Sequence, residues 1–369
     1  MTTGEASPPA LERTADALVD RLFQSSLGMF DVMSVYLGDR LGLYRALRDG
    51  GPSTPAELAA RARIDPRYAL EWLEQQAAID ILEVDDVAAA KGDRRFNLPA
   101  AYVEPLLNPD SPYSIAPLGR SIVASAKVLP QLLEAYRTGG GVDRSAYGLD
   151  TIESQGDLNR PWLVNSFGTE LLPAIPDVHE RLIADPPARV ADVACGVGWA
   201  AISIARAYPK VRVDGFDLDD PSIELARRNA GATGVDDRVT FAVRDAADPA
   251  AVGQYDLVVM VEALHDMSRP VEGLAAVRRM LRPDGIALII DEKTEDAFGA
   301  PASDIERLYY GFSIFSCLPS AMNERPTAAT GTVMRADTMR RYASEAGFSG
   351  FERLDEPELD MLRFYRLTP

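Results

Sequence analysis

The segment Val190 to Trp199 constrains the fold more than any other part of the chain. It reads Val-Ala-Asp-Val-Ala-Cys-Gly-Val-Gly-Trp and leads into a helical run at 200–208. A short apolar strand that carries one acid, reaches two glycines and gives way to a helix is typical of a nucleotide pocket in a parallel sheet. Glycine lets a ligand approach the backbone because it has no Cβ. The helix would present free N–H groups and a positive dipole end to that ligand.

Strands and helices alternate after residue 189. The predicted strands are 190–194, 211–217, 239–243, 256–261 and 286–291, and the helices between them are 200–208, 221–230 and 272–281. A helix at 338–346 and strands near Phe351 and at 361–367 close the chain. The strands are mostly apolar without strict alternation, which indicates a parallel sheet covered on both faces. The predicted fold class is therefore α/β, preceded by a mainly helical region.

Composition limits the classes of partner. The 369-residue chain has a formal charge of −18, which disfavours phosphate backbones and anionic lipid surfaces. Residues 1–9 lack the features of a signal peptide, and no apolar run is long enough to span a bilayer. Two cysteines are too few for a disulfide framework. We therefore expect a cytoplasmic protein that binds neither nucleic acid nor membrane.

The N-terminal region carries large apolar residues before any sheet could cover them. Residues 11–47 have apolar side chains at helical spacing, among them Leu22, Phe30 and Leu37, and predict two helices broken near Gly28. Burial in a homodimer is the favoured interpretation. Packing against later helices of the same chain is the alternative.

Residues 51–100 have the pattern of a winged helix. Helices are predicted from Ser53 to Ala62 and from Asp65 to Ala78, followed by short strands at 81–84 and 95–98. Such a module often reads DNA. This one has six Lys and Arg against nine Asp and Glu, a net charge of −3. A dimerising role is therefore favoured over a ligand-responsive DNA-binding regulator.

Helices with a loop at 139–141 and a turn around Gly156 are predicted between the winged helix and the sheet. They end at Asp185-Pro186-Pro187, a suitable junction. We therefore divide the chain into a dimerisation domain at 1–110, a helical linker lining the pocket at 111–185 and a cofactor-binding domain at 186–369.

Three acids mark the predicted strand ends. Asp192 precedes the glycines, Asp217 ends the second strand, and Asp245 follows the third. Ligands bind at the carboxyl ends of parallel strands, so these acids should share one crevice. Asp217 is placed to accept hydrogen bonds from two ribose hydroxyls, and Asp245 to accept one from an adenine amino group. Asp192 is placed to hold a positively charged amino-acid head.

A nicotinamide dinucleotide is the rival cofactor. Gly196, Gly198 and Ala201 satisfy the loose Gly-x-Gly-x-x-Gly/Ala pattern, and Asp217 has suitable spacing. Asp192 argues against it, because a pyrophosphate gains nothing from an adjacent carboxylate.

The runs 190–198, Gly215-Phe-Asp217-Leu-Asp219 and Arg244-Asp245-Ala246 resemble the class I S-adenosylmethionine-dependent methyltransferases. With the winged helix in front, the chain is most similar to two-domain small-molecule O-methyltransferases of secondary metabolism. The resemblance implies a Rossmann-like seven-stranded sheet with an antiparallel last strand, a homodimer, and S-adenosylmethionine converted to S-adenosylhomocysteine. Ala194 stands where the family usually has its first glycine. The cofactor would contact Asp192, Ala194, Cys195, Gly196, Gly198, Asp217, Leu218, Asp245, Ala246 and Glu262.

The resemblance also assigns a reacting end. His265 and Asp266 match the first two residues of a family His-Asp-Trp sequence, whose histidine is the general base, while Met267 departs from the tryptophan. A neutral imidazole can take a phenolic proton near neutral pH. Asp291 corresponds to the acid that orients the histidine. No metal is expected, because Glu262 and Asp266 lack the further ligands of an oxygen-donor site.

An aromatic insert at 293–335 and the helical linker are where we expect the acceptor. The predicted acceptor contacts are Trp162, Phe167, Met267, Tyr309 and Phe312. The expected reaction is methyl transfer to a hydroxyl of an aromatic or polyketide-like metabolite. A different reaction on the same fold stays open.

Overall fold

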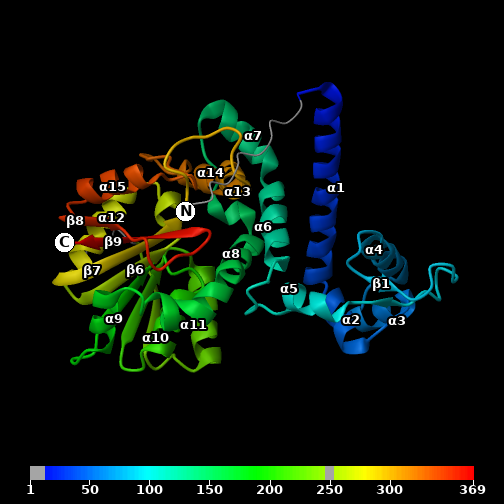
Figure 1. Ribbon diagram of the computed structural model, residues 1–369, viewed down its shortest axis with the longest axis horizontal. Helices are drawn as coiled ribbons and strands as arrows, with labels where there is room; N and C mark the ends of the chain where they lie inside the picture. Colours follow the sequence, from blue (N-terminus) through cyan, green and yellow to red (C-terminus); the bar gives the residue numbers. More distant parts are fainter. Residues whose placement is uncertain (1–12, 246–252) are drawn as a thin grey trace, which may run out of the picture. The chain divides into compact units, whose positions relative to one another are not determined.

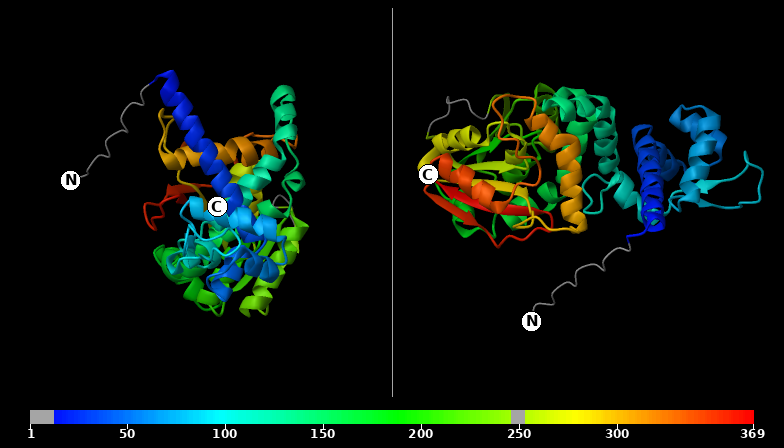
Figure 2. Two further views of the ribbon diagram at one scale, coloured as in Figure 1. Left: turned by 90° about the vertical axis from the view of Figure 1, so that its right-hand side faces the viewer. Right: turned by 90° about the horizontal axis from the view of Figure 1, so that it is seen from above.

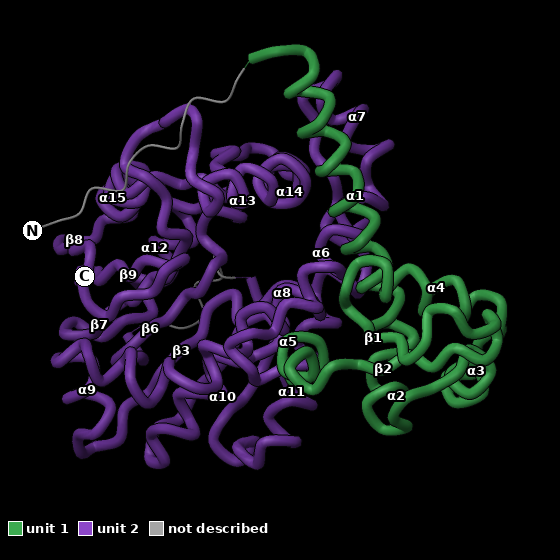
Figure 3. Tube along the Cα trace, turned by 45° about the vertical axis from the view of Figure 1, so that its right-hand side comes forward, with its two compact units in different colours: residues 1–108 green, residues 109–369 purple. Residues whose placement is uncertain are grey.

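The computed structural model describes residues 13–245 and 253–369 and divides the chain into two compact units. Residues 1–108 form the N-terminal unit and residues 109–369 the C-terminal unit (Figure 3). None of the helices in the described ranges has the length and hydropathy of a membrane span.

The N-terminal unit is mainly helical. Its core gathers Leu43, Leu47, Leu58 and Leu73 beneath the short strands. Capping fixes the helix starts, because Thr54 and Glu57 form a reciprocal capping box and Asp65 caps the next helix. The elements are α1 (Ala15–Arg40), α2 (Leu43–Gly50), α3 (Pro55–Ala62), α4 (Pro66–Ala78), β1 (Glu83–Val84), β2 (Phe96–Asn97), η1 (Ala100–Tyr102) and α5 (Val103–Leu107).

The predicted break at Gly28 is wrong. Helix α1 continues through Gly28, where a Cβ would meet no atom within 4 Å. A single exposed glycine costs a helix only about 1 kcal/mol, which its neighbours offset. The chain turns instead at Gly42, whose φ of 67° lies in the left-handed region that favours glycine.

Helix α1 exposes much of its apolar surface. Leu22 is 56% exposed, Phe23 59% and Phe30 67%. The residues that were predicted to need a cover are therefore not buried within the N-terminal unit.

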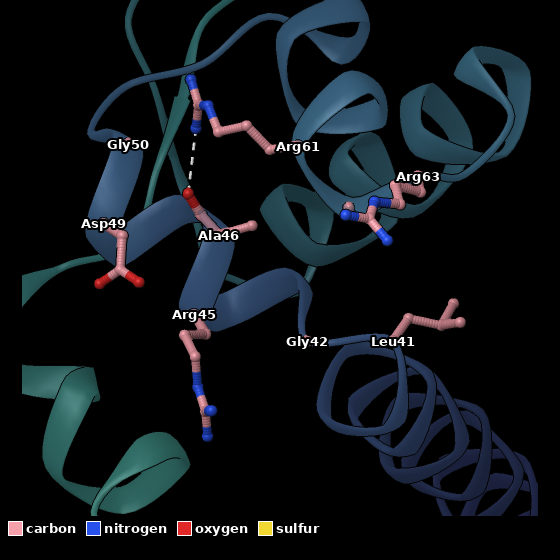
Figure 4. Close-up of a pocket in the computed structure, with 9 residues that line it drawn as sticks. Leu41, Gly42, Arg45, Ala46, Asp49, Gly50, Arg61 and Arg63 are labelled. Carbon is pink, nitrogen blue, oxygen red and sulfur yellow. Dashed lines mark hydrogen bonds between the residues drawn. The ribbon is translucent and has the colours of Figure 1, made fainter.

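A pocket of about 520 Å³ lies within the N-terminal unit (Figure 4). Its wall includes Arg45, Arg61 and Arg63. Arg61 Nη1 donates to the carbonyl oxygen of Ala46 at 3.0 Å and to Ser53 Oγ at 2.8 Å. Arg61 thus joins α2 to α3, which is a structural role. The pocket contains none of the predicted site residues.

A seven-stranded sheet forms the centre of the C-terminal unit. Its strands are β3 (Arg189–Val193), β4 (Arg212–Asp217), β5 (Val239–Val243), β6 (Tyr255–Val261), β7 (Leu281–Glu292), β8 (Gly350–Arg353) and β9 (Leu362–Thr368). The spatial order is β5-β4-β3-β6-β7-β9-β8. Strands β3 to β7 are parallel, and β9 is antiparallel to both of its neighbours. The predicted sheet and its antiparallel last strand are confirmed.

Helices cover both faces of this sheet, as Figures 1 and 2 show. Successive residues of β3 enter opposite cores: Val190 packs with α9, α10 and α11, and Ala191 packs with α12 and α15. The helices are α6 (Ala116–Lys127), α7 (Leu129–Thr138), η2 (Arg144–Tyr147), α8 (Leu149–Trp162), η3 (Leu163–Leu171), α9 (Pro176–Ile183), α10 (Trp199–Ala207), α11 (Asp220–Thr233), η4 (Leu264–Asp266), α12 (Pro270–Met280), α13 (Asp304–Phe312), η5 (Ser313–Cys317), α14 (Leu318–Ala321) and α15 (Ala336–Glu345). The unit is a three-layer α/β/α sandwich.

The predicted turn at Gly156 is also wrong, because α8 runs through it. A Cβ at this position would lie 2.3 Å from Val197 Cγ2. Gly156 therefore allows α8 to pack closely against the glycine loop that follows β3.

Candidate active site

A cavity of about 640 Å³ lies beside the carboxyl ends of β3, β4 and β6. All of its lining residues belong to the C-terminal unit. The predicted site residues on its wall are Asp192, Ala194, Cys195, Gly196, Asp217, Leu218, Asp245, Glu262 and Met267. The sheet therefore brings together most of the residues that the sequence assigned to a cofactor.

Three residues of the loop after β3 adopt left-handed backbone angles. Ala194 has φ 57°, Gly196 has φ 51° and Gly198 has φ 86°. Ala194 thus adopts a left-handed conformation, which costs an alanine about 1–2 kcal/mol relative to glycine. Gly198 is absent from the described cavity wall, and its missing Cβ makes room for Phe241 Cζ, 2.5 Å from where that atom would lie. Gly198 acts through packing.

The Asp217 carboxylate is held by the backbone at the end of β4. Its Oδ2 accepts a hydrogen bond from the N–H of Gly196 at 2.8 Å, and its Oδ1 accepts one from the N–H of Asp219 at 2.9 Å. Each oxygen keeps a lone pair, because a carboxylate offers about four acceptor sites. The carboxylate is therefore fixed on the cavity wall and can still accept hydrogen bonds from a ligand.

Asp192 is only 1% exposed although it lines the cavity. Its Oδ2 accepts from the N–H of Ala201 at 3.0 Å, in the first turn of α10. Burial raises the pKa of Asp192 to about 7, and the nearby Asp217 carboxylate adds to the rise. A cationic group in the cavity would stabilise the ionised form.

Asp245 and Leu218 complete the side of the cavity near β4 and β5. Both are exposed, Leu218 to 64%, so an apolar surface and a carboxylate face the cavity together. The prediction for Ala246 lies outside the described residues.

Glu262 follows β6 in a left-handed conformation with φ 47°, which is unusual for a residue other than glycine. Asn159 Nδ2 donates to Glu262 Oε2 at 2.7 Å, and Trp162 Nε1 donates to Asn159 Oδ1 at 2.9 Å. Burial raises the pKa of Glu262. Asn159 lines the cavity and was missed by the sequence, because it lies in α8, far from the motif that it supports.

His265 lies in the loop between β6 and α12 and is only 2% exposed. Its Nδ1 lies 2.7 Å from Asp291 Oδ1, in a hydrogen bond, and 2.9 Å from Glu292 Oε2. Its Nε2 lies 3.3 Å from Asp266 Oδ1. The predicted pairing of His265 with Asp291 is thus present in the geometry. Among the described residues His265 and Asp291 are not part of the cavity wall, but Asp266 is.

The atoms around His265 are of the types that bind metals, and two groups of three lie within 4.8 Å of one another. The separation of 2.7 Å between His265 Nδ1 and Asp291 Oδ1 is that of a direct hydrogen bond. Two ligands of one tetrahedral zinc ion lie roughly 3.3 Å apart, given its bond lengths. The geometry fits a hydrogen-bonded cluster, and we do not assign these residues as metal ligands.

Four predicted acceptor contacts lie off the described part of the cavity wall. Phe167 is fully buried in the core and meets Trp162 edge to face, with ring centroids 5.5 Å apart. Tyr309 is 2% exposed, and its hydroxyl donates to the carbonyl oxygen of Met361. Phe312 is half-buried in α13. Aromatic residues at helical spacing serve the core in these helices, which corrects their expected placement.

Arg144 is a cavity residue that the sequence did not indicate, because it lies in the short helix η2 outside any motif. Its Nη1 lies 3.4 Å from Asp266 Oδ2, and its Nη2 donates to Gln155 Oε1 at 2.7 Å. Arg144 therefore links the loop after β6 to α8 across the cavity wall.

Comparison with known proteins agrees with this geometry. Residues 190–285 match the family model described as a methyltransferase domain. These residues form a class I methyltransferase domain. The domain holds the glycine loop, Asp217, Asp245 and His265, which are the residues that carried the resemblance in the sequence. The predicted methyltransferase domain and fold class are confirmed.

The methyltransferase domain is similar to curated and solved proteins. The malonyl-[acyl-carrier protein] O-methyltransferase of Halalkalibacterium halodurans is 26% identical over 116 residues, which are 30% of this chain and 42% of that protein. The chain thus spans less than half the length of this curated relative.

Two solved structures match almost the whole chain. Human N-acetylserotonin methyltransferase, solved in complex with S-adenosylmethionine, has a TM-score of 0.70 at 17% identity and covers 98% of this chain and 99% of its own. Mitomycin 7-O-methyltransferase has a TM-score of 0.67 at 17% identity, with coverages of 96% and 98%. At these identities the likeness concerns the fold.

Proposed function

We propose that the chain transfers a methyl group from S-adenosylmethionine to a hydroxyl of a small aromatic or polyketide-like metabolite. One observation carries this proposal. Acids from the ends of three neighbouring strands, Asp192, Asp217 and Asp245, converge on one cavity inside a methyltransferase domain.

The charge of the cavity wall favours a cationic cofactor. The described wall holds eight carboxylate residues and three arginines. The acids are Asp143, Asp192, Asp217, Asp219, Asp245, Glu262, Asp266 and Glu324, and the arginines are Arg144, Arg244 and Arg269. S-adenosylmethionine carries a sulfonium and an ammonium group, whereas the pyrophosphate of a dinucleotide would add negative charge. The wall therefore supports S-adenosylmethionine over a nicotinamide cofactor.

The carboxylates suit particular parts of that cofactor. Asp217 would accept hydrogen bonds from the ribose hydroxyls, Asp245 from the adenine amino group, and Asp192 would hold the ammonium. Leu218 would pack against the adenine ring. The cofactor supplies an activated methyl group, and the protein's task is to place an acceptor oxygen in line with it.

An oxygen acceptor is supported by the activities after which similar enzymes are named. The malonyl-[acyl-carrier protein] and mitomycin enzymes are O-methyltransferases by name. In this chain Met267 and Asn323 line the cavity and would contact the acceptor.

Isothermal titration calorimetry tests the proposal. S-adenosylmethionine and S-adenosylhomocysteine are expected to bind one per chain with micromolar dissociation constants. Affinity should fall as the pH is lowered through about 7, because Asp192 then takes up a proton and loses its attraction for the ammonium. NAD is the control and should not bind. Binding of NAD alone, or of none of these ligands, would contradict the proposal.

We propose further that the chain is a homodimer joined through α1. This is the dimerising role that the sequence predicts for residues 1–110. The exposed side chains of Leu22, Phe23 and Phe30 motivate this. Replacing Leu22 and Phe30 together with aspartate should give a monomer by light scattering, because charges oppose burial of this face. Replacing Asp20 and Gln24 with alanine, which lie on the other side of the same helix, is the control and should leave the dimer intact. A monomeric wild type would favour cover by the chain's own helices.

A cytoplasmic location remains a proposal. It is supported by Cys195 and Cys317, which are both free thiols.

A further inference from the structure

His265, the residue that the family resemblance marks as the general base, is enclosed by carboxylates in this chain. We infer that His265 is a positively charged positioning residue, which fixes Asp266 in the cavity wall and does not itself take the acceptor's proton. The catalytic part of this inference rests on the proposed methyl transfer. The charge of the ring does not.

Both ring nitrogens of His265 face carboxylates. Nδ1 is 2.7 Å from Asp291 Oδ1 and 2.9 Å from Glu292 Oε2, while Nε2 is 3.3 Å from Asp266 Oδ1. A neutral imidazole carries one N–H and one lone pair, so in either tautomer one lone pair would point at a carboxylate. Only the imidazolium offers a proton to both sides.

The groups packed around the ring are mainly acidic. Asp266 approaches from η4, Asp291 and Glu292 from the end of β7, Glu262 from the loop after β6, and the Cys317 thiol from η5. Burial by itself lowers the pKa of a histidine, but the three adjacent carboxylates outweigh it and hold the pKa of His265 well above its ordinary value.

Three buried carboxylate oxygens also lack a hydrogen-bond partner of good geometry, namely Asp266 Oδ1, Asp291 Oδ2 and Glu292 Oε2. Such atoms are costly unless a positive charge lies close by. The imidazolium provides that charge. A proton shared between Asp291 and Glu292 neutralises part of the negative charge that the imidazolium leaves uncompensated. The raised pKa of Glu292 agrees with this.

The ring is also almost fully buried and is not among the described residues of the cavity wall. A general base must come within hydrogen-bond distance of the proton that it takes. His265 is 2% exposed and absent from the described cavity wall, whereas Glu262 and Asp266 are part of it. Of these two carboxylates Glu262 has the higher pKa, so it is the better proton acceptor. The hydroxyl proton would pass to its carboxylate as the new O–CH3 bond forms and the S–CH3 bond breaks.

His265 instead connects the sheet to the cavity wall. A continuous chain of polar contacts runs from Asp291 through His265 to Asp266, and then through Arg144 to the neutral Gln155 in α8. Its expected effect is to keep the Asp266 carboxylate ionised and fixed in direction.

Nitrogen-15 NMR of the histidine-labelled full chain tests the charge directly. The chain has only two histidines, so His179→Gln leaves His265 as the sole source of ring signals. Both ring nitrogens are expected to be protonated at every point from pH 6 to 8. A neutral ring at pH 7.5 would overturn the inference, and so would loss of a ring proton on adding Zn²⁺. This measurement needs neither cofactor nor turnover, so its result is valid even if the proposed function is wrong.

The pH profile of methylation tests the catalytic part. His265→Gln should lower kcat by less than about 100-fold and keep the acidic limb of the profile, whereas Glu262→Gln should remove that limb. A general base contributes about 10²- to 10⁴-fold. A larger loss in His265→Gln, together with disappearance of the acidic limb, would restore the histidine as the base. Calorimetry of cofactor binding by both variants separates these results from loss of the cofactor.

Discussion

Replacing Asp217 with alanine is expected to lower the affinity for S-adenosylmethionine by about 100-fold or more. A hydrogen bond to a charged acceptor contributes about 1.5–3 kcal/mol, and two ribose hydroxyls would lose theirs together. The substitution also releases the N–H groups of Gly196 and Asp219, which the carboxylate now holds at 2.8 and 2.9 Å. Calorimetry measures the dissociation constant, and thermal unfolding shows whether the fold survives.

Asp217→Asn separates the two effects. The amide keeps an oxygen that can accept hydrogen bonds but loses the charge, so its loss of affinity should be smaller than that of alanine. Asp220→Ala is the matched control, because Asp220 is exposed at the start of α11 and is not part of the described cavity wall. Equal losses at residues 217 and 220 would show that Asp217 does not contact the cofactor.

The sheet could be predicted because its strands are buried on both faces. Such strands are continuous apolar runs, and the order of strands in a doubly wound sheet then brings Asp192, Asp217 and Asp245 to one edge. The helix breaks expected at Gly28 and Gly156 could not be judged from sequence. Whether a glycine ends a helix depends on what packs beside it, and Gly156 faces Val197, which lies 41 residues further along the chain.

The catalytic side could be predicted only in part. The motif located His265, Asp266 and Met267, and the order of the strands brought Asp291 beside the histidine. Asn159 and Arg144 come from helices outside the motif, and no spacing rule connects them to it. The prediction that aromatic residues contact the acceptor was wrong for another reason. A helical stripe of aromatics has the same pattern whether it faces a cavity or a core, so only packing distinguishes the two.

The backbone of the glycine loop shows the same limit. Ala194 stands where the family usually has its first glycine, and a Cβ disfavours left-handed angles, but the φ of Ala194 is 57° and therefore left-handed. Alanine reaches that region at a modest cost, which the surrounding loop contacts offset. Local preference thus set an expectation that tertiary packing overrode.

Replacing His265 with alanine is expected to destabilise the fold by about 3–5 kcal/mol, because the change leaves buried carboxylates without their cation. The raised pKa of His265 means that the folded chain keeps a proton that the unfolded chain loses above its ordinary pKa of 6.5. This stabilisation is complete below pH 6.5 and declines as the pH rises through the raised value. Urea denaturation at pH 6 therefore measures it in full.

A second substitution distinguishes lost charge from lost packing. If the cost arises from uncompensated acids, adding Glu292→Gln to His265→Ala should recover part of the stability, since one buried carboxyl group no longer needs neutralising. Lost volume would not be recovered in this way, and the two costs would then add. His179→Ala is the matched control, with an expected loss of about 1 kcal/mol for its single hydrogen bond to Tyr208. Recovery in the double variant would place the imidazolium at the centre of this cluster.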